Sequence, residues 1–250
     1  MSSLDVPTPT AVAAGQGRSG LKYQIVGSLL QSAILELQPG QPIFSETGAM
    51  SWMTSNVNMN TTSAGGLGGL LKRAVSGASL FIIDFAATGG TGLIAFTSDF
   101  PGQILPVDLA PGQSLLLQKH AFMCAEKSVT LDIGFNKKIG AGMFGGEGFI
   151  MQRITGPGLA FVEFDGEIVE YVLQPDQTLR VDQGHVAMFE PTVTFDIEMI
   201  KGFRNILLGG EGLFLATLRG PGRVWLQTMP IVNLAHRIME YMPKPSSSSG

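Results

Sequence analysis

A motif that occurs three times constrains the fold of this chain more than any other feature of its sequence. The stretch LQPGQ at residues 37–41 returns as LAPGQ at 109–113 and as LQPDQ at 173–177. A glycine-containing stretch (SGAS, then GGEG twice) and a Gly-x-Gly turn (GTG, then GPG twice) follow each copy in the same order. Because such self-similarity indicates repeated structural units, we predict three homologous units. They are expected at about 21–100, 101–165 and 166–230.

Each unit has the sequence pattern of β-structure. Val57, Met59 and Thr61 alternate with asparagines, which is the period of a strand and not of a helix. The apolar stretches on both sides of Asp165-Gly166 predict a β-hairpin, because this dipeptide is typical of two-residue turns. From the usual lengths of strands and spacings of turns, we expect about 18 to 24 short strands. The predicted fold class is all-β: three units with a pseudo-threefold repeat that hide their strand edges by closing into a sandwich, a barrel or a β-helical roll.

The two ends of the chain depart from this pattern. After Pro230, apolar residues follow one another at helical spacing, which predicts a short amphipathic helix over 231–242. Residues 1–20 and 244–250 are rich in Pro, Ser, Thr, Ala and Gly and are expected to be disordered tails. A single all-β domain is therefore predicted over 21–243.

Composition limits the partners and the compartment. The net charge of −4 gives no electrostatic reason to expect nucleic-acid binding. The single cysteine, Cys124, cannot form an intrachain disulfide, and residues 1–20 have no apolar segment of a secretory signal. A cytoplasmic location is expected, and a mitochondrial one only for a eukaryotic host with non-standard targeting. With 33 glycines and only 14% charged residues, the chain has little polar surface, which favours a closed homo-oligomer.

Motifs that would carry catalytic chemistry are weak. GAGMFG at 140–145 fits the dinucleotide pattern G-x-G-x-x-G, but the residues after it predict a strand and not the helix that such a site needs. A metal site would need converging ligands, and His120, His185, His236 and Cys124 do not recur between units. No catalytic residue, cofactor or metal site is predicted, although a metal-dependent β-roll enzyme using His120, Cys124 or His185 stays as an alternative.

Four acidic residues gather around the expected hairpin. Paired carboxylates can act as general acid and base, but alternation along a hairpin makes a solvated polar face the preferred interpretation. These residues are Glu163, Asp165, Glu167 and Glu170.

Basic residues recur beside the glycine-containing stretch of each unit. Glycine-rich backbone can hold anions, and basic residues beside apolar ones can bind anionic lipid. The alternative interpretation is that the glycines allow close packing while the basic residues solvate the loop ends. The candidate residues for an anion or membrane surface are Lys72, Arg73, Lys137, Lys138, Lys201 and Arg204.

Five motifs in order resemble one known family. They are ETGAMSWM at 46–53, FPGQILPVDL at 100–109, GAGMFGGEGF at 140–149, GHVAMFEP at 184–191 and GGEGLFLATLRGPGRVWLQ at 209–227. The chain resembles the family of altered inheritance of mitochondria protein 24, whose bacterial members are mostly uncharacterised. The resemblance implies a fold similar to the trp RNA-binding attenuation protein class, which is a double-stranded β-helix-like or β-sandwich-like arrangement, and suggests homotrimers. It implies no established enzymatic activity.

Three functional hypotheses follow. The first is a non-enzymatic oligomeric scaffold or interaction protein, with a membrane surface or another protein as its partner. The second is a binding module for a small anionic ligand. The third is the metal-dependent β-roll enzyme named above.

Overall fold

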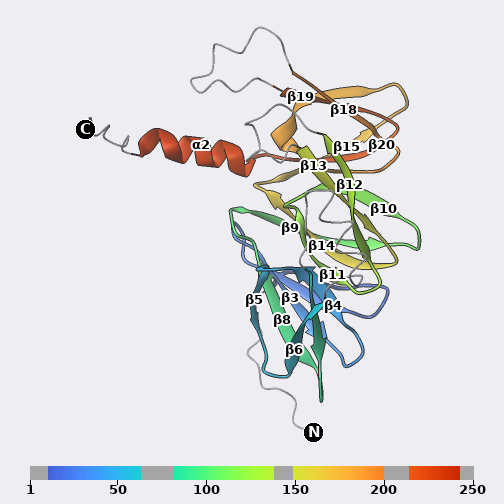
Figure 1. The fold of residues 1–250 in the computed structure, drawn as a ribbon, viewed down its shortest axis with the longest axis vertical. Helices are drawn as coiled ribbons and strands as arrows, with labels where there is room; N and C mark the ends of the chain where they lie inside the picture. Colours follow the sequence, from blue (N-terminus) through green and yellow to red (C-terminus); the bar gives the residue numbers. More distant parts are fainter. Residues whose placement is uncertain (1–10, 63–81, 138–148, 200–213, 243–250) are drawn as a thin grey trace.

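The computed structural model describes residues 11–62, 82–137, 149–199 and 214–242 (Figure 1). These residues form 20 strands, the short 3₁₀ turn η1 (Gln183–His185) and the C-terminal helix α2 (Ile231–Tyr241). The predicted all-β fold with one short C-terminal helix is confirmed.

The strands fall into an N-terminal pair and three groups of six. The pair is β1 (Ala11–Gln16) and β2 (Lys22–Val26). The first group is β3 (Ser32–Leu37), β4 (Ile43–Glu46), β5 (Met50–Met53), β6 (Val57–Thr62), β7 (Ile82–Ala87) and β8 (Gly92–Thr97). The second group is β9 (Gly102–Leu109), β10 (Ser114–Gln118), β11 (Phe122–Glu126), β12 (Thr130–Lys137), β13 (Phe149–Thr155) and β14 (Gly158–Asp165). The third group is β15 (Ile168–Leu173), β16 (Thr178–Asp182), β17 (Val186–Phe189), β18 (Thr194–Met199), β19 (Phe214–Arg219) and β20 (Gly222–Gln227).

The same antiparallel pairings recur in all three groups. The first strand pairs with the sixth, the second with the fifth, the third with the sixth and the fourth with the fifth. The third strand has a register shift at the same place each time, just before Trp52, Cys124 and Met188. Each group lies within one predicted unit; that a threefold axis relates them stays a prediction.

Strands of neighbouring groups join into shared sheets. The second strand of one group pairs with the third strand of the next, as β4 with β11 and β10 with β17. The two resulting six-stranded sheets have the orders β6-β7-β4-β11-β14-β9 and β12-β13-β10-β17-β20-β15. Two smaller sheets lie at the ends, β1-β2-β3-β8-β5 and β16-β19-β18. Figure 1 shows the first group at the lower end of the molecule and β18 and β19 at the upper end.

The repeated proline motif forms the same turn three times. The side-chain oxygens of Gln41, Gln113 and Gln177 accept hydrogen bonds from backbone N–H groups three residues earlier, at 3.4, 3.0 and 2.8 Å. Asp176 at φ 67° stands where the other two turns have glycine. Aspartate tolerates this left-handed conformation better than most residues, which explains why Pro-Asp replaces Pro-Gly.

A second repeated contact holds the Gly-x-Gly turn at the start of each sixth strand. Thr54 Oγ1 accepts from Leu93 N at 3.0 Å and Glu126 Oε2 from Leu159 N at 2.6 Å. In the third group, Glu190 Oε2 accepts from the backbone N–H of the matching residue, Arg223, at 2.9 Å. The acceptor is the last residue of the third strand in the second group and the residue just after it in the other two, so the contact ties the third strand to the sixth.

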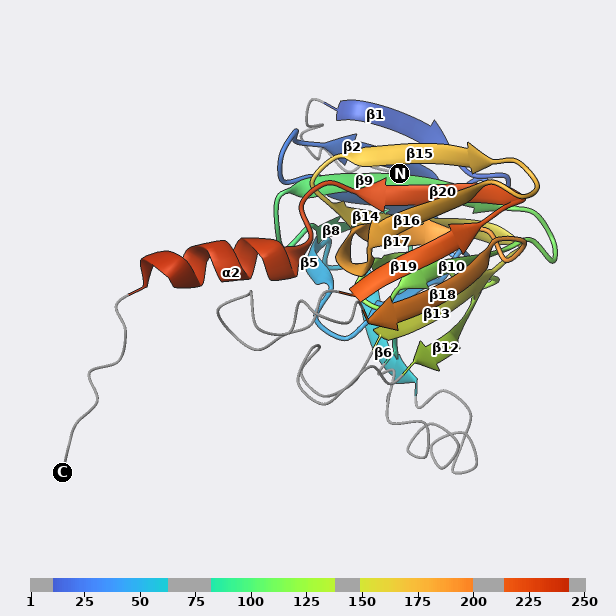
Figure 2. The same cartoon turned by 90° about the horizontal axis from the view of Figure 1, so that it is seen from above.

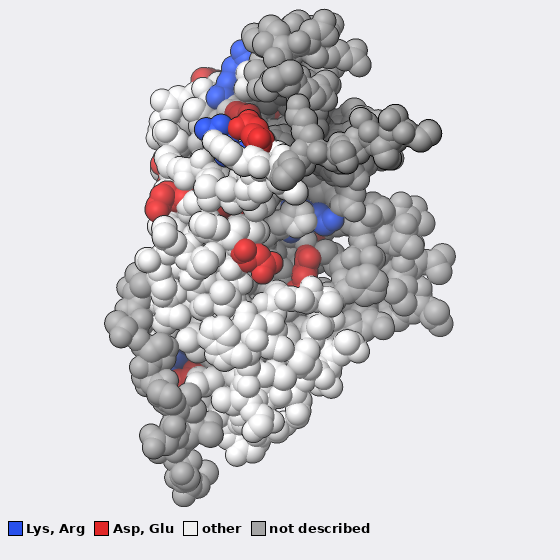
Figure 3. All heavy atoms as spheres, turned by 90° about the vertical axis from the view of Figure 1, so that its left-hand side faces the viewer, with Lys and Arg blue, Asp and Glu red and all other residues white. Residues whose placement is uncertain are grey.

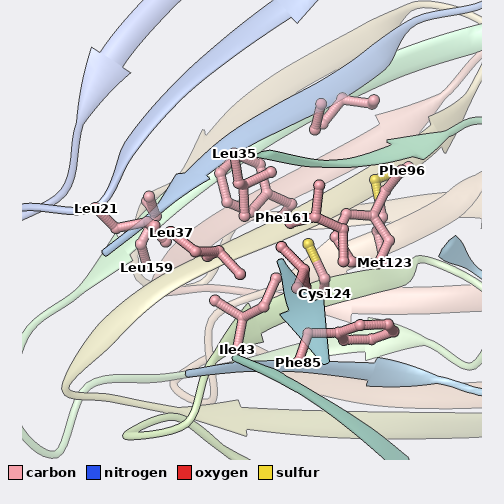
Figure 4. Packing of buried hydrophobic residues seen from close by; sticks show 14 of the residues in the cluster. Leu21, Leu35, Leu37, Ile43, Phe85, Phe96, Met123, Cys124, Leu159 and Phe161 are labelled. Atoms are coloured by element: carbon pink, nitrogen blue, oxygen red, sulfur yellow. The ribbon is translucent and has the colours of Figure 1, made fainter. Parts of the chain in front are cut away.

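Three apolar clusters form the core, and each contains side chains from at least two of the groups. In the cluster that Figure 4 shows, Leu35, Ile43 and Phe85 of the first group pack with Cys124 and Phe161 of the second. These five side chains are fully buried. Because neighbouring groups share their cores as well as their sheets, the body of the molecule is continuous.

Two local predictions were wrong. Residues 11–16 are not part of a tail, since β1 pairs with β2 over Ala11–Gln16. Asp165-Gly166 does not close a hairpin, because β14 and β15 lie in different sheets. Gly166 N donates to Pro101 O at 2.9 Å. The positive φ of 82° at Gly166 lets the chain pass from the last strand of the second group to the first strand of the third.

Helix α2 extends away from the body (Figures 1 and 2). It begins after Pro230, whose ring suits a helix start, and the carboxylate of Asp165 accepts a hydrogen bond from Ile231 N at 2.7 Å. A carboxylate at a helix N-terminus satisfies a free N–H and complements the helix dipole. The predicted helix over 231–242 is thus confirmed within one residue.

Candidate interaction surface

The third strand is buried in the second and third groups and exposed in the first group. β11 and β17 are buried along their whole length, since β4 and β10 of the preceding groups cover them. β5 belongs to the first group and pairs with β8 alone among the described strands. Its four residues, Met50–Met53, are exposed or half-buried.

Trp52 shows this difference most clearly. Cys124 and Met188 occupy the equivalent place after the register shift and are 0% exposed, whereas Trp52 is 51% exposed. Cys124 packs into the cluster built mainly by the first group, and Met188 into that of the second. Each of these side chains therefore fills the core of the preceding group, whereas no group of six strands precedes that of Trp52 among the described residues.

The second strands show the complementary pattern at the other end. Phe44 in β4 and Leu116 in β10 are buried against the following group. Arg180, at the equivalent place in β16, is exposed, and β16 pairs with β19 alone among the described strands. Among the described strands, β5 and β16 thus each lack the neighbour that their inner equivalents have.

The face that carries β5 has few charges. Figure 3 looks at the left side of Figure 1, where β5 and α2 lie, and the described residues in its lower half are almost all uncharged. A contiguous surface without charge is typical of a contact region between proteins.

A cleft of ≈ 360 Å³ lies between the second and third groups. The guanidinium of Arg223 lies 3.6 Å from Glu170 and 3.9 Å from Glu190, and Trp225 Nε1 donates to Glu170 at 3.0 Å. Asp108 also lines the cleft. Two carboxylates face the guanidinium of Arg223, and Asp108 is paired with Arg18 at 3.6 Å, so the cleft lining has no excess of positive charge for an anionic ligand.

Comparison with known proteins identifies the family. The family model described as mitochondrial biogenesis AIM24 matches residues 23–229. The chain belongs to the AIM24 family. An uncharacterised protein of Streptococcus pyogenes serotype M6 is 30% identical over 221 residues, which cover 85% of this chain and 87% of that protein. The crystal structure of a protein from Streptococcus pyogenes aligns with a TM-score of 0.72 and 25% identity, over 89% of this chain and 100% of that one.

The basic residues predicted as an anion or membrane surface in this AIM24 protein lie outside the described residues, with one exception. Lys137 is the last residue of β12, and its side chain is not among those described. Lys72, Arg73, Lys138, Lys201 and Arg204 fall in the segments 63–81, 138–148 and 200–213, as does GAGMFG. Each segment joins the fourth and fifth strands of its group, which are paired. The anion or membrane role of these residues stays a prediction.

The three histidines and the single cysteine of this AIM24 protein lie in four different places in the fold. Burial raises the pKa of the fully buried Cys124 thiol well above its ordinary value. His185 Nδ1 donates to Gln227 O at 2.7 Å, while His120 is exposed on the turn between β10 and β11, and His236 lies in α2. Among the side chains that the structure describes, no three His, Cys, Asp or Glu residues are grouped to hold a metal ion.

The acidic residues around Asp165-Gly166 do not form one solvated face, which corrects that part of the sequence interpretation. Asp165 is buried, and Glu163 is partly so. Burial, followed by the charges of Asp99 and Asp165, raises the pKa of Glu163 to about 7. Glu167 and Glu170 accept hydrogen bonds from Gln103 and Trp225. Sequence alternation missed this because β14 is covered on both sides.

Helix α2 adds a second apolar surface to the AIM24 protein. Ile238, Met239 and Tyr241 in its outer half, and Met242 directly after it, are each exposed by more than half of their surface. On its polar side Arg237 and Glu240 form an ion pair at 2.8 Å, which leaves that side without net charge from these two residues. Within the described residues, no helix has the length and apolarity to cross a membrane.

Proposed function

We propose that this AIM24 protein is a non-enzymatic scaffold that works as a homo-oligomer, with a homotrimer as the first choice. The observation that carries the proposal is the exposure of Trp52 on β5, at a place where the two equivalent side chains are buried. An aromatic side chain beside half-buried methionines on an uncharged face is typical of a protein–protein contact. A second copy of the chain supplies the missing cover.

The surroundings of the reactive residues support the non-enzymatic part. The thiol of Cys124 is buried, and a raised pKa disfavours the nucleophilic thiolate. His185 is held by a backbone carbonyl. Alanine at His120 or His185 is therefore expected to leave the metal content and the assembly unchanged. Loss of a bound metal in either variant would revive the enzyme hypothesis.

Native mass spectrometry of the gently purified full-length chain tests the scaffold. We expect a multiple of 26.5 kDa, three copies first, with no added mass. A chain that stays monomeric up to high micromolar concentration contradicts the scaffold proposal. A stoichiometric small-molecule adduct would favour the anionic-ligand module instead.

Helix α2 favours a second role, attachment to a membrane surface. An amphipathic helix that stands clear of the body can place its apolar side chains at the headgroup boundary. Because Arg237 is paired with Glu240, binding through α2 is expected to depend little on salt. Binding through the six predicted basic residues would weaken with added salt.

Vesicle sedimentation separates these two modes. Ile238→Ser combined with Met239→Ser should abolish sedimentation with uncharged and anionic vesicles alike. Tyr171→Ser is the control, since Tyr171 is 44% exposed on β15 and lies outside α2. If the unaltered chain does not sediment with either vesicle, the membrane role is wrong.

A further inference from the structure

We propose that the cleft between the second and third groups binds an extended peptide segment of a partner protein, in the way in which the chain's own residues 17–26 occupy the equivalent place between the first and second groups. The inference goes beyond the homo-oligomer, because the cleft is built by one chain. It arises from two junctions that are built alike, of which one is filled and the other is open.

The filled junction shows how a strand occupies this place. β2 pairs antiparallel with β3, the first strand of the first group, and Tyr23 lies opposite Leu35. Leu21 and Ile25 are buried in the cluster that the first group shares with the second (Figure 4). The ring of Tyr23 lies edge-on to Phe161 of the second group, with 5.2 Å between the ring centres. The segment 17–26 thus covers the space between the first strand of one group and the sixth strand of the next.

Polar contacts hold the same segment to both groups. Ser19 Oγ donates to the carboxylate of Glu126, and Gln41 Nε2 donates to Ser19 O at 3.2 Å. Lys22 forms an ion pair with Glu36 at 3.5 Å. Apolar side chains on one side and carboxylates on the other therefore bind one extended stretch.

The open junction repeats these parts. Five residues that line the cleft stand at the places of residues that hold the segment 17–26: Val107 for Leu35, Asp108 for Glu36, Gln113 for Gln41, Glu190 for Glu126 and Trp225 for Phe161. The cleft of ≈ 360 Å³ lies where the filled junction holds the segment.

β9 has an open edge at this cleft. Among the described strands β9 pairs with β14 alone, whereas β3 pairs with both β8 and β2. Leu105 and Val107 are half-buried, while Ala33 and Leu35 at the equivalent places of β3 are fully buried. An open sheet edge beside a groove for alternate side chains is how proteins bind extended peptides. The missing neighbour of β9 is therefore a strand like β2.

The lining indicates which segment fits. In the register of β2 on β3, alternate apolar residues of the partner lie opposite Val107 and Leu105, and the first of them faces the ring of Trp225. The residue before them lies opposite Asp108, as Lys22 lies opposite Glu36.

Asp108 favours a basic residue at that place. Its Oδ2 accepts from Arg18 N at 3.1 Å, whereas its buried Oδ1 has no hydrogen-bond partner among the described residues. A buried carboxylate oxygen without a donor is costly, and a lysine or arginine side chain would supply one. The partner segment thus has a basic residue followed by two apolar residues with one residue between them.

Two differences make the open junction a weaker site than the filled one. Ile104 N points away from β14 and donates to Gln31 Oε1 at 2.7 Å, so by alternation Pro106 is the next residue that faces the open edge. Proline has no N–H to donate to an added strand. Arg223 also replaces Leu159, against which Gly17 packs in the filled junction. Binding therefore relies more on side chains and is reversible.

A synthetic peptide with the sequence of residues 17–26, GRSGLKYQIV, is the probe. Full-length chain with Trp52→Phe keeps Trp225 in the cleft as its single tryptophan. Titration with the peptide should change the Trp225 emission in a saturable way. A peptide that replaced the chain's own segment at Phe161 would leave this emission unchanged, and that result overturns the inference.

Two altered peptides test the chemistry without altering the fold. Serine at the places of Tyr23 and Ile25 should weaken binding by at least about tenfold, because the apolar contacts are lost. Glutamate at the place of Lys22 should also weaken binding, and less so at high salt, because it faces Asp108. Equal binding of all three peptides would mean unspecific adhesion and would overturn the inference.

Asp108→Asn tests the register. It should reduce the preference for lysine over glutamate in the peptide, while Glu36→Gln, at the equivalent place of the filled junction, should leave that preference unchanged. Equal preferences in both variants contradict the proposed register and with it the inference. A small molecule that copurifies with the chain and competes with the peptide would assign the cleft to that molecule instead. The homo-oligomer is tested separately by native mass spectrometry and stands or falls without the peptide.

Discussion

The inner junctions of this AIM24 protein and its two ends use the same strands in different surroundings. β11 and β17 are buried by the preceding group, while β5, with the same pairing and the same register shift, exposes its tryptophan. The difference lies in the neighbour and not in the strand itself. A repeat unit of this kind forms the pairings among its own six strands, but it depends on the neighbouring unit to complete its sheets and cover its core. Other stacked repeat proteins behave in the same way.

The largest predicted effect distinguishes an inner junction from an end. Met188→Ala removes a fully buried side chain and should lower the free energy of unfolding by about 2–5 kcal/mol. Trp52→Ala at the equivalent place should lower it by less than about 1 kcal/mol in dilute protein, since half of the ring is already in water. Urea unfolding of the two variants measures both values. Equal losses would mean that Trp52 is covered within a single chain.

The contacts at the Gly-x-Gly turns give the next effect. Glu126→Ala leaves the N–H of Leu159 without its acceptor in a buried place, and the expected loss is about 2–3 kcal/mol. Glu190→Ala affects the equivalent contact of the third group, which is more exposed, and should cost about 1 kcal/mol. Thermal unfolding gives the order of the two. A reversed order would show that burial does not decide the strength of this repeated contact.

A third prediction concerns the place that holds Glu163 in the second group and Gln227 in the third. The folded chain keeps the Glu163 proton up to a pKa of about 7, while the unfolded chain loses it from about 4.5. The folded state therefore binds more protons between these values, and stability falls as pH rises from about 4.5 to 7. Glu163→Gln should remove this loss and stabilise the fold at pH 8 by about 2 kcal/mol.

Denaturant unfolding at pH 5 and pH 8 checks the predicted stabilisation by Glu163→Gln. The variant and the unaltered chain should differ little at pH 5, where the carboxyl is largely protonated in the folded state. A gain of equal size at both pH values would mean that the effect comes from packing and not from ionisation.

The sequence predicts the repeated features of this fold well because each has a local cause. The Pro-Gly turn needs a left-handed residue and a glutamine that accepts from the backbone, and both are visible as LQPGQ, LAPGQ and LQPDQ. Helix α2 is visible from its apolar spacing after Pro230. These signals depend on neighbours in the chain and not on distant contacts.

What the sequence did not predict depends on contacts between groups. Asp165-Gly166 looks like a hairpin turn, but β15 pairs with β20, because the first strand of each group pairs with its sixth. The open edges of β5 and β16 were not predicted either. MSWM at 50–53 is as apolar as its equivalents, and Trp52 is exposed because β5 has β8 as its single partner among the described strands.

The smallest predicted effect concerns the open edge of β16. Arg180 bonds Glu198 at 2.6 Å, but both side chains are more than half exposed, and such pairs contribute at most about 0.5 kcal/mol. Arg180→Ala should therefore leave the unfolding free energy of the monomer almost unchanged, in contrast to the large cost expected for the buried Leu116 at the equivalent place. Dilute urea unfolding of Arg180→Ala and Leu116→Ala makes this comparison. A loss above about 1 kcal/mol for Arg180→Ala would show that β16 is supported within its own chain, and then the contrast between inner junctions and ends would not hold.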